Sequence, residues 1–598
     1  MTRTVVRSLR MKPLPEDAEM SLGQLVAENA ARFPGRPFLS CEGEQLTWRN
    51  FNTRANRYAH RLRQAGVGKG DHVALMLENR VEFLTALIGI CKLGAAVGLI
   101  NTNQRRDVLR HSVNLIGAKQ FIFGEECRAA VEEVRAELDL PDGAYLFVPD
   151  RRAGDTGGDE PPPWAERFHS EVEAGPDFDP PETAGVQQRD PCFLVFTSGT
   201  TGMPKAAVVR NERLFRAMQG YGRVCLDVAP SDKLYNCLPL YHSTGLIVGF
   251  GSIAYGGASM FLRRRFSASR FVNETREEGT NLFIYVGELC RYLVSQPEKA
   301  DDARNPLTKS IGNGLRPDIW MDFKRRFGIS HVYELYGASE GNAGFVNAFN
   351  KDSTIGFGLT PHVLAQYDVD ADELVRDDAG RCVPVQKGEA GLLLTEISDK
   401  ARFDGYTDAD ASEKKIVRGV VESGDAYFNT GDLVREVDVG FAFRKTHYQF
   451  VDRTGDTFRW KGENCSTNEV AEVLNGAPNV ATANVFGVLL PGCDGRAGMA
   501  ALTLDGDAPE LGRVDWEAFH RYVAERLPAY ARPVFLRITK EQPSTETFKL
   551  QKTKLRHEAY HPDRTAGDPI LVLLPGESAY RPLSEETYRA IEAGEAGF

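Results

Sequence analysis

Short apolar runs alternate with helical patterns from about residue 70 to residue 340 of this 598-residue chain. Continuous apolar runs of this length predict buried strands, and they are HVALML (72–77), FLVF (193–196), SMFL (259–262), NLFIYV (281–286) and HVYEL (331–335). Helices are predicted over 246–256 and 318–328, the second opened by Pro317 and ended by Gly328. This alternation predicts an α/β fold with largely parallel sheets.

A second, smaller unit is predicted to begin near Asp452. Its first helix opens with Ser466-Thr467-Asn468-Glu469, which has the spacing of a capping box. Strand patterns follow over 480–490, 499–504 and 534–538, with an amphipathic helix over about 515–527. About 145 residues with their own apolar runs are enough for a separate small α+β domain.

Composition excludes several classes of protein. Apolar residues make up 42% and charged residues 26% of the chain, which excludes disorder and collagen. The net charge of −11 disfavours general nucleic-acid binding, so an anionic ligand requires a local site. Ten scattered cysteines without a CxxC pair predict buried, reduced thiols in a cytosolic protein.

Two segments bear on targeting. The start, MTRTVVRSLRMK, is basic but has no apolar stretch long enough for a signal peptide. Residues 83–100 are apolar but are interrupted by Lys92 and several glycines. We therefore expect a buried helix that leads into a core strand here, rather than a membrane span.

The strongest local motif is TSGTTGMPK (197–205), directly after the strand pattern at 193–196. Its two glycines allow successive N–H groups to face an anion, while four hydroxyls and Lys205 add donors and charge. Such a loop suits a triphosphate. It is not a Walker P-loop, because Met203-Pro204 separates Gly202 from Lys205. Composition alone leaves an ordinary polar turn as the alternative.

This loop resembles the phosphate-binding signature of the adenylate-forming superfamily of acyl-CoA synthetases, peptide-synthetase adenylation domains and luciferases. Two more motifs follow in that family's order: YGASE (336–340) is similar to YGxTE, and YFNTGD (427–432) is similar to YxxTGD. Residues 450–470, GNGLRP (312–317) and the segment 487–500 most resemble the fatty acid transport protein / very-long-chain acyl-CoA synthetase branch. The resemblance spans about residues 20–590.

The resemblance implies a large N-terminal domain of stacked mixed and parallel sheets with helices (1–451), a hinge (452–456), and a small mobile α+β domain (457–598). It places ATP phosphates on Thr197, Ser198, Gly199, Thr200, Thr201, Gly202, Lys205 and Ser339. Glu340 is the implied catalytic and metal-binding carboxylate, since Mg2+ prefers one or two carboxylates plus phosphates. A solvated loop acid is the alternative for Glu340.

The same resemblance places adenine and ribose on Gly312, Asn313, Gly314, Leu315, Tyr336, Gly337, Asp432 and Arg453. Glycine allows the backbone to approach the base, and the Tyr336 ring offers it a flat face. The Asp432 carboxylate can accept both ribose hydroxyls. The alternative for Tyr336 is a structural role as a core aromatic residue. The alternative for Arg453 is an ordinary ion pair with Asp452.

Lys549 is the implied catalytic cation that bridges substrate carboxylate and α-phosphate, with Lys552 and Lys554 as competing candidates. His242, in LPLYHSTG (238–245), is the implied residue beside the acyl group, with a structural role as the alternative. Leu246 stands where some long-chain relatives carry a gating Trp.

The implied activity is that of an AMP-forming acid–thiol ligase, acting on long or very long fatty acids with ATP, Mg2+ and coenzyme A. Rotation of the small domain about Asp452 and Gly455 would bring Gly462 toward the coenzyme A side.

Competing hypotheses are an acyl-AMP ligase with a carrier-protein acceptor, an uptake protein acting by vectorial acylation, and a regulatory nucleotide binder without catalysis. We expect a cytoplasmic protein, with peripheral contact at the inner membrane surface, no nucleic-acid partner, and an oligomeric state that the sequence leaves open.

Overall fold

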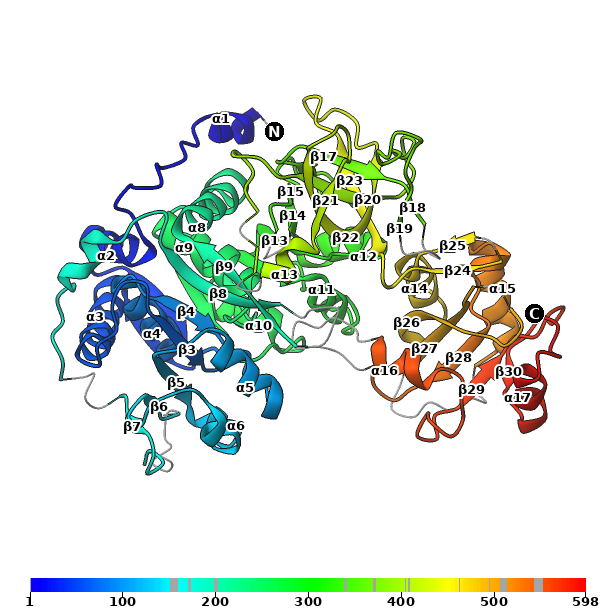
Figure 1. Ribbon diagram of the computed structural model, residues 1–598, viewed down its shortest axis with the longest axis horizontal. Coiled ribbons are helices and arrows are strands. Elements are labelled where there is room, and N and C mark those ends of the chain that lie inside the picture. Colours follow the sequence, from blue (N-terminus) through cyan, green and yellow to red (C-terminus); the bar gives the residue numbers. More distant parts are fainter. Residues whose placement is uncertain are drawn as a thin grey trace. The chain divides into compact units, whose positions relative to one another are not determined.

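The computed structural model describes residues 2–150, 160–169, 174–197, 203–337, 341–368, 373–403, 405–406, 409–461, 463–493, 495–505, 514–542 and 552–598. The chain forms two compact units (Figure 1). The first comprises residues 1–315, 319–352 and 399–415, and the second comprises residues 316–318, 353–398 and 416–598. Each unit is described by itself.

The first sheet of the first unit contains the strands from the later part of the predicted α/β region, together with β1 and β2 from the start of the chain. Its order is β15-β14-β13-β12-β10-β11-β1-β2. Strands β10 to β14 are parallel to their neighbours, whereas β15 and β2 pair antiparallel at the ends. The bounds are β1 Pro37–Cys41, β2 Glu44–Thr47, β10 Lys233–Asn236, β11 Ser259–Leu262, β12 Leu282–Val286, β13 Lys309–Asn313, β14 His331–Gly337 and β15 Gly344–Val346.

The second sheet of this unit has the order β7-β6-β5-β3-β4-β8-β9. It is parallel except for the last pair, β8 and β9, which is an antiparallel hairpin. The bounds are β3 His72–Met76, β4 Ala96–Leu99, β5 Gln120–Gly124, β6 Tyr145–Val148, β7 Glu166–Arg167, β8 Pro191–Thr197 and β9 Lys205–Arg210. The predicted strands are thus confirmed, and the antiparallel edges agree with the mixed sheets that the resemblance implied.

A layer of helices joins the two sheets of the first unit. Helix α3 (Trp48–Gln64) packs on β1 and β2, and α4 (Val81–Lys92) packs on β3 and β4. The two helices also pack on each other (Figure 1). The other helices are α1 Thr2–Leu9, α2 Leu22–Arg32, α5 Arg106–Leu115, α6 Arg128–Val134, α8 Asn211–Met218, α9 Gly251–Gly256, α10 Phe271–Glu278, α11 Gly287–Val294, α12 Pro317–Phe327 and α13 Ala409–Glu413.

The apolar segment 83–100 is a buried helix followed by a core strand, as predicted. Helix α4 is covered along its length, and β4 is buried at every position. Lys92 is fully buried and forms an ion pair with Asp179. Over the described part of the chain, no helix is both long enough and apolar enough to cross a membrane.

Of the two helices predicted in the α/β region, one is confirmed and the other is not. Helix α12 begins at Pro317, and Gly328 follows its last residue with a left-handed φ of 67°, as expected. The segment 246–256 is not a single α-helix: residues Thr244–Phe250 form π-helical turns before α9 begins. Such turns are rare and occur frequently at functional sites.

The second unit contains two larger sheets. One has the order β17-β20-β22-β21, with β23 also paired to β22, and the other has the order β26-β27-β28-β29-β30. The bounds are β17 His362–Ala365, β20 Gly391–Glu396, β21 Ile416–Arg418, β22 Ala426–Val437, β23 His447–Arg453, β26 Val480–Val488, β27 Ala497–Leu504, β28 Phe535–Ile538, β29 Ile570–Val572 and β30 Arg581–Pro582. Short pairs are β18 Tyr367–Asp368 with β19 Glu373–Leu374, and β24 Phe458–Trp460 with β25 Glu463–Cys465.

Four helices accompany these sheets: α14 (Thr467–Asn475), α15 (Trp516–Arg526), α16 (Thr553–Glu558) and α17 (Glu585–Glu592), counted over the described residues. Ser466 caps α14, since its hydroxyl accepts the Glu469 N–H at 3.3 Å, which is one half of the predicted capping box. Buried residues of α14, β26, β27 and β28 form one apolar core.

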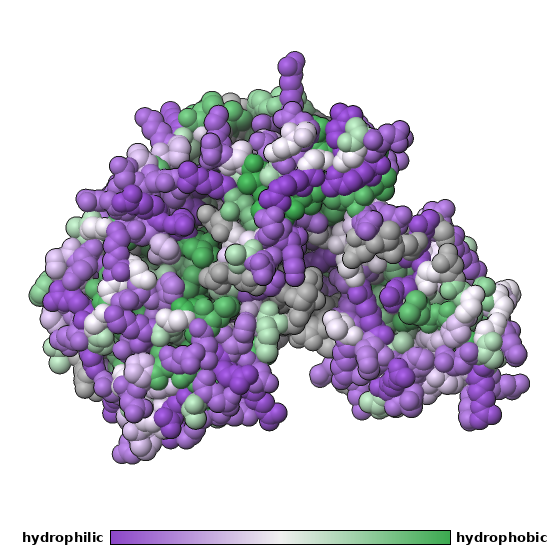
Figure 2. Space-filling model, in the orientation of Figure 1, coloured by the Kyte–Doolittle hydropathy of each residue, from purple (hydrophilic) through white to green (hydrophobic). Residues whose placement is uncertain are grey.

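Apolar side chains are mostly interior, and the surface seen in Figure 2 is largely hydrophilic. All ten cysteines are free thiols, and nine of them are buried. Burial raises the pKa of Cys91 to about 12, which keeps that thiol protonated. These observations agree with the prediction of buried, reduced cysteines.

Candidate active site

The segment Gly312–Leu315 leaves the carboxyl end of β13 and is pressed against β12. A Cβ atom on Gly312 would lie 2.1 Å from the carbonyl oxygen of Tyr285, so only glycine fits there. Gly314 has a left-handed φ of 81°, and its carbonyl oxygen lies against Gly287, where an added Cβ would approach it to 1.6 Å. The two predicted glycines therefore shape a backbone segment that no larger residue could reproduce.

Glu334 supports this segment from inside the sheet. One of its carboxyl oxygens accepts the backbone N–H of Gly314, and also that of Leu315 at 3.2 Å. The other oxygen accepts the Tyr285 hydroxyl at 2.6 Å. Burial raises the pKa of Glu334 to about 8, although these hydrogen bonds act in the opposite direction. Glu334 thus fixes the backbone at which the nucleotide was predicted to bind.

The His242 segment meets the same edge of the sheet. The hydroxyl of Thr244 donates a 3.0 Å hydrogen bond to the side-chain oxygen of Asn313. His242 is half-buried, and its ring contacts the Tyr241 ring at a centroid distance of 4.7 Å. The π-helical turns begin two residues later, at Thr244. The structure therefore brings the His242 motif next to the Gly312–Leu315 segment.

Tyr336 and Gly337 lie at the carboxyl end of β14, the parallel neighbour of β13. Gly312 is the register partner of Glu334, which places Tyr336 just beyond the end of β13 along the sheet. Tyr336 is half-buried, with its ring 5.7 Å from that of Phe345. Ligands of open α/β sheets bind beyond the carboxyl ends of the strands, so this edge is the candidate nucleotide site.

The predicted phosphate loop connects β8 to β9. Thr197 and Lys205 are register partners that close the hairpin, and the Lys205 ammonium lies 5.2 Å from the centre of the Tyr406 ring. That contact is a cation–π interaction with a segment that comes two hundred residues later in the chain. Lys205 is half-buried.

Ala401 and Tyr406 contact the chain that follows the Tyr336 motif and the phosphate hairpin, respectively. Tyr406 forms a bridge with Ala207 of β9, while the Asn342 side chain donates to the Ala401 carbonyl at 2.8 Å. Arg213, on the helix that follows β9, donates to the Gly341 carbonyl at 2.8 Å. The chain around the phosphate hairpin and the chain just after YGASE are therefore in direct contact.

The predicted ribose residues lie in the second unit, on paired strands. Asp432 of β22 and Arg453 of β23 are register partners, and their carboxylate and guanidinium groups are 3.6 Å apart. The Asp432 backbone N–H donates to the Thr430 hydroxyl, which in turn donates to the Leu393 carbonyl. Asp432 is mostly buried, whereas Arg453 is half-exposed. The carboxylate is thus held in place, while its basic partner remains accessible to solvent.

Asp452, the first predicted hinge residue, is fully buried and heavily hydrogen-bonded. Its side chain accepts from the Thr467 N–H at 2.6 Å and the Thr467 hydroxyl at 2.7 Å. It also accepts from the Arg453 N–H at 2.9 Å and the Asn468 amide at 3.1 Å. Asp452 therefore fastens the end of β23 to the start of α14.

The other end of the predicted hinge is held by α16. Arg556 donates to the Gly455 carbonyl at 2.7 Å and to the Asp456 carboxylate at 3.0 Å. Lys552 donates to the Thr467 hydroxyl at 2.5 Å and lies 3.6 Å from Asp456. Burial lowers the pKa of Lys552, while Asp452 and Asp456 oppose that shift. Sequence reasoning missed this role of Arg556.

The two lysines that competed with Lys549 have partners of their own. Lys552 belongs to the buried cluster at the hinge, and Lys554 is mostly exposed, 3.7 Å from Glu558. Nine predicted residues lie outside the described part of the chain: Ser198, Gly199, Thr200, Thr201, Gly202, Ser339, Glu340, Gly462 and Lys549. Their roles stay predictions. Among the described residues, no group of three or more His, Cys, Asp or Glu side chains could hold a metal ion.

Comparison with known protein families shows the family to which this chain belongs. Residues 26–406 match the AMP-binding enzyme family, and residues 469–549 match the AMP-binding enzyme C-terminal domain. This chain belongs to the AMP-binding enzyme family.

Relatives in the family extend over nearly the whole chain. A medium/long-chain-fatty-acid–CoA ligase of Mycobacterium tuberculosis is 41% identical over 97% of this chain and 92% of its own length. Human long-chain fatty acid transport protein 1 is 37% identical over 92% of this chain and 84% of its own length. Both names agree with the branch that the sequence motifs indicated.

The fold is shared with solved structures of CoA ligases. The crystal structure of an anthranilate CoA ligase in complex with anthranoyl-AMP has a TM-score of 0.75. It is 22% identical in sequence and covers 92% of this chain and 98% of that one. The expected adenylate-forming fold is therefore confirmed.

Within this family fold, Glu334 is a contributor to the site that the motifs did not reveal. The sequence signal that could have found Glu334 is a lone acid in the buried run HVYEL (331–335). An acid enclosed by apolar strand residues needs hydrogen-bond partners, and here the partners belong to the nucleotide segment.

Proposed function

We propose that this chain is an ATP-dependent fatty acid–CoA ligase that activates a long- or very-long-chain carboxylic acid through an acyl-adenylate. The observation that carries the proposal is the convergence at the carboxyl ends of β13 and β14. There the Thr244–Asn313 hydrogen bond joins the predicted acyl-side motif to the predicted adenine segment. The names of the relatives from Mycobacterium tuberculosis and human support a fatty acid as the substrate.

In the proposed first step, a carboxylate oxygen of the fatty acid attacks the α-phosphorus of ATP. The bond from that phosphorus to the bridging oxygen breaks, and pyrophosphate leaves with the electron pair. A carboxylate has no good leaving group of its own, whereas the resulting mixed anhydride can release AMP. No protein Ser or Cys has to be acylated.

We assign the residues to this step as follows. Lys205 and the hydrogen-bond donors of the phosphate hairpin bind the triphosphate, and Lys549 stabilises the charge that develops between carboxylate and α-phosphate. Tyr336 and the Gly312–Leu315 backbone hold adenine, while Asp432 accepts the ribose hydroxyls. Glu340, as a single carboxylate beside phosphate oxygens, suits Mg2+, which would supply charge neutralisation.

In the proposed second step, the thiol of coenzyme A attacks the acyl carbonyl and AMP departs. We propose that residues 457–598 rotate about 452–456 between the steps, and that Gly462 then lies on the coenzyme A side. Gly455 supports this assignment, because a side chain added there would meet no atom within 4 Å. A change in its backbone would therefore displace no packed side chain, although it would strain or break the hydrogen bond from Arg556 to the Gly455 carbonyl.

A panel of fatty acids from medium to very long chains tests the proposal, with pyrophosphate and acyl-CoA measured with and without coenzyme A. Acyl-CoA from long chains is expected. Pyrophosphate release without acyl-CoA would support the alternative acyl-AMP ligase, for which the acceptor is a carrier protein. No pyrophosphate with any acid would contradict the proposed reaction.

We also propose a cytoplasmic protein with peripheral membrane contact, because its substrate resides in bilayers. The hairpin tip between β22 and β23 supports this, since Phe441 is 68% exposed, its ring is 4.9 Å from that of Phe443, and Arg444 follows. Aromatic and cationic side chains together favour an anionic lipid surface. Fractionation before and after a salt wash tests this, since a peripheral protein is released by salt. A protein that stays membrane-bound would instead favour a separate membrane activity in fatty acid uptake.

A further inference from the structure

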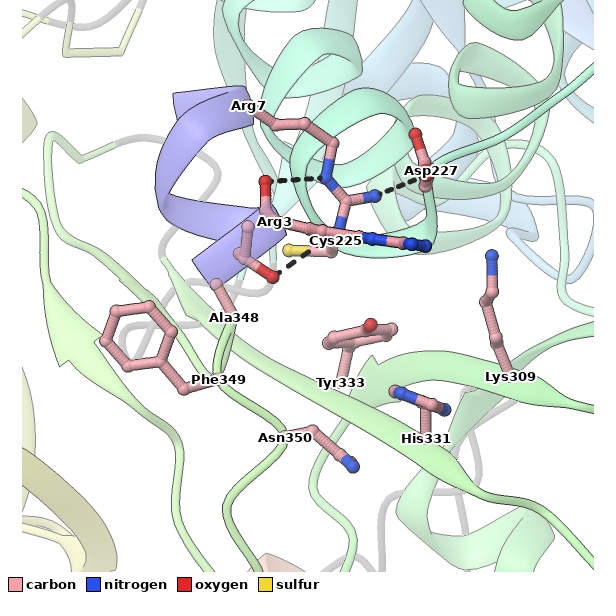
Figure 3. Close-up of a pocket in the computed structure, with 11 residues that line it drawn as sticks. Arg3, Arg7, Cys225, Asp227, Lys309, His331, Tyr333, Ala348, Phe349 and Asn350 are labelled. Carbon is pink, nitrogen blue, oxygen red and sulfur yellow. Dashed lines mark hydrogen bonds and ion pairs between the residues drawn. The ribbon is translucent and has the colours of Figure 1, made fainter. Parts of the chain in front are cut away.

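A cavity in the first unit lies at the opposite end of the sheet from the candidate active site. Lys309 and His331 are the first residues of β13 and β14 and are register partners, whereas Gly312 and Tyr336 lie near the other ends of those strands. The cavity has a volume of about 430 Å³. It is lined by Arg3, Thr4, Arg7, Cys225, Asp227, Lys309, His331, Tyr333, Ala348, Phe349 and Asn350 (Figure 3).

Basic side chains from three separate elements surround this cavity. Arg3 and Arg7 come from α1, Lys309 comes from β13, and His331 comes from β14. Figure 3 shows Arg3, Lys309 and His331 directed toward a common open space. The Lys309 ammonium is held in position by the Leu226 carbonyl, to which it donates a hydrogen bond. Positive charge is thus gathered at this cavity although the net charge of the chain is −11.

The positive charge in the cavity exceeds the negative charge. Among the described lining residues, Asp227 is the only acid, and it pairs with Arg7 at 2.8 Å and with Arg223 at 3.4 Å. The Arg3 guanidinium has no carboxylate partner among the described residues, and Lys309 donates to a neutral carbonyl. Two cations, the exposed Arg3 and the half-buried Lys309, therefore remain without a carboxylate partner beside the cavity, and together they attract anions.

The ionisation of His331 reports the same excess. Partial desolvation lowers the pKa of His331, although the residue is exposed, and the neighbouring cations Lys309, Lys324 and Arg7 lower it further. The Nδ1 atom of its ring lies 2.8 Å from the Ser330 hydroxyl. An anion placed between Arg3 and Lys309 would reverse the effect of the cations and raise this pKa.

We propose that this cavity binds a phosphate group carried by a small organic molecule or by a lipid headgroup. Arg3 and Lys309 would form charge-assisted hydrogen bonds to the phosphate oxygens. The volume of the cavity lies in the range of small-molecule sites and exceeds what a bare phosphate needs, so the rest of the ligand would lie against Tyr333. The site is separate from the proposed catalytic reaction. A bound phosphate would bridge α1 to the first residues of β13 and β14.

The direct test follows the imidazole NMR signal of His331 in the full chain, assigned by its loss in His331→Gln. Inorganic phosphate is added at constant ionic strength, with chloride as the reference salt. The expected result is a saturable shift of the His331 signal and a rise in its pKa. A signal that responds equally to phosphate and to chloride would overturn the proposal.

Variants separate the site from general charge effects. Arg3→Gln and Lys309→Met should each weaken phosphate binding at His331 about tenfold or more, because each removes one charge-assisted contact. Arg10→Gln is the matched control, since Arg10 is an exposed cation just after α1 that does not line the cavity. Equal effects of Arg3→Gln and Arg10→Gln would overturn the proposal. Adenylation by these variants should remain at the parental rate.

The two sources of phosphate are distinguished by two probes. Glycerol 3-phosphate represents a soluble ligand, and vesicles of phosphatidylcholine with an equimolar amount of phosphatidic acid represent a lipid headgroup, with pure phosphatidylcholine as control. Loss of glycerol 3-phosphate binding in Arg3→Gln supports a soluble ligand. If Arg3→Gln lowers co-sedimentation with the phosphatidic acid vesicles and not with pure phosphatidylcholine vesicles, the phosphate belongs to a lipid headgroup. If Arg3→Gln changes neither result, the proposal is wrong.

Discussion

The hydroxyl oxygen of Tyr285 lies 2.6 Å from a carboxyl oxygen of Glu334, inside the sheet that carries the candidate nucleotide site. The opposite oxygen of Glu334 accepts the N–H groups of Gly314 and Leu315. A pKa raised to about 8 keeps this carboxyl mostly protonated at neutral pH. The neutral acid can then donate to the Tyr285 oxygen, while that hydroxyl turns to the Tyr333 carbonyl at 3.3 Å.

Glu334→Ala is expected to disturb both stability and ATP binding. It leaves the buried N–H of Leu315 and the part-buried N–H of Gly314 without an acceptor. This should lower the free energy of unfolding by about 3 kcal/mol and raise the KM for ATP about tenfold. Glu334→Gln keeps the accepting oxygen and can donate to Tyr285, so it should cost less than about 1 kcal/mol. Denaturant unfolding measures the stability of the two variants, and initial rates at varied ATP concentration measure their KM. Equal effects of the two substitutions would show that Glu334 does not support the segment.

The ionisation of Glu334 should also make stability depend on pH. Its folded pKa of about 8 exceeds the ordinary value of about 4.3, so between these values the folded state holds a proton that the unfolded state has lost. Unfolding then releases a proton, and stability should fall as pH rises through this window and level off above it. The difference in unfolding free energy between the parent and Glu334→Gln, measured across the window, isolates this contribution. A difference that is constant with pH would contradict the raised pKa.

Lys549→Ala should block adenylation and spare thioester formation from supplied acyl-adenylate. Loss of one donor at the developing charge should slow adenylation about a hundredfold, or about 3 kcal/mol. Lys552→Ala is the matched comparison, because Lys552 is bound to Thr467 and Asp456 in the hinge cluster. We expect it to lower the free energy of unfolding instead of removing adenylation selectively. Equal loss of both half-reactions in Lys549→Ala would show that its role is not specific to adenylation.

The hinge prediction concerns Gly455. Gly455→Pro should leave adenylation largely intact and slow thioester formation, since proline restricts both its own backbone and that of Thr454. Gly455→Ala is the control for volume, because the structure has room for a Cβ there. Separate assays of the two half-reactions check this. If Gly455→Pro performs both at the parental rate, the pivot lies elsewhere.

The elements that the sequence predicted well are those with a strong local signal. Runs such as NLFIYV and HVYEL are continuous apolar stretches, and they form β12 and β14. Pro317 and Gly328 bound α12 because each has a backbone preference that suits one end of a helix. The motifs at 312–315 and 336–337 were likewise recognisable, and the register of β13 and β14 brings them to one edge.

Other features depend on tertiary contacts that no local pattern encodes. The π-helical turns at Thr244–Phe250 cannot be told from an α-helix by apolar periodicity. Nothing local to Glu334 reveals that its partners are Tyr285 and the backbone of Gly314. The role of Lys552 likewise required the contact of α16 with residues 456 and 467, which lie about a hundred residues earlier in the chain.

The most direct test of the proposed chemistry follows an oxygen atom. A long-chain fatty acid labelled with ¹⁸O in its carboxylate is incubated with the full chain, ATP, Mg2+ and coenzyme A, and the products are examined by mass spectrometry. Attack of the carboxylate on the α-phosphorus predicts that AMP carries one labelled oxygen while pyrophosphate carries none. Label in pyrophosphate or inorganic phosphate, or acyl-CoA formed with unlabelled AMP, would contradict an acyl-adenylate.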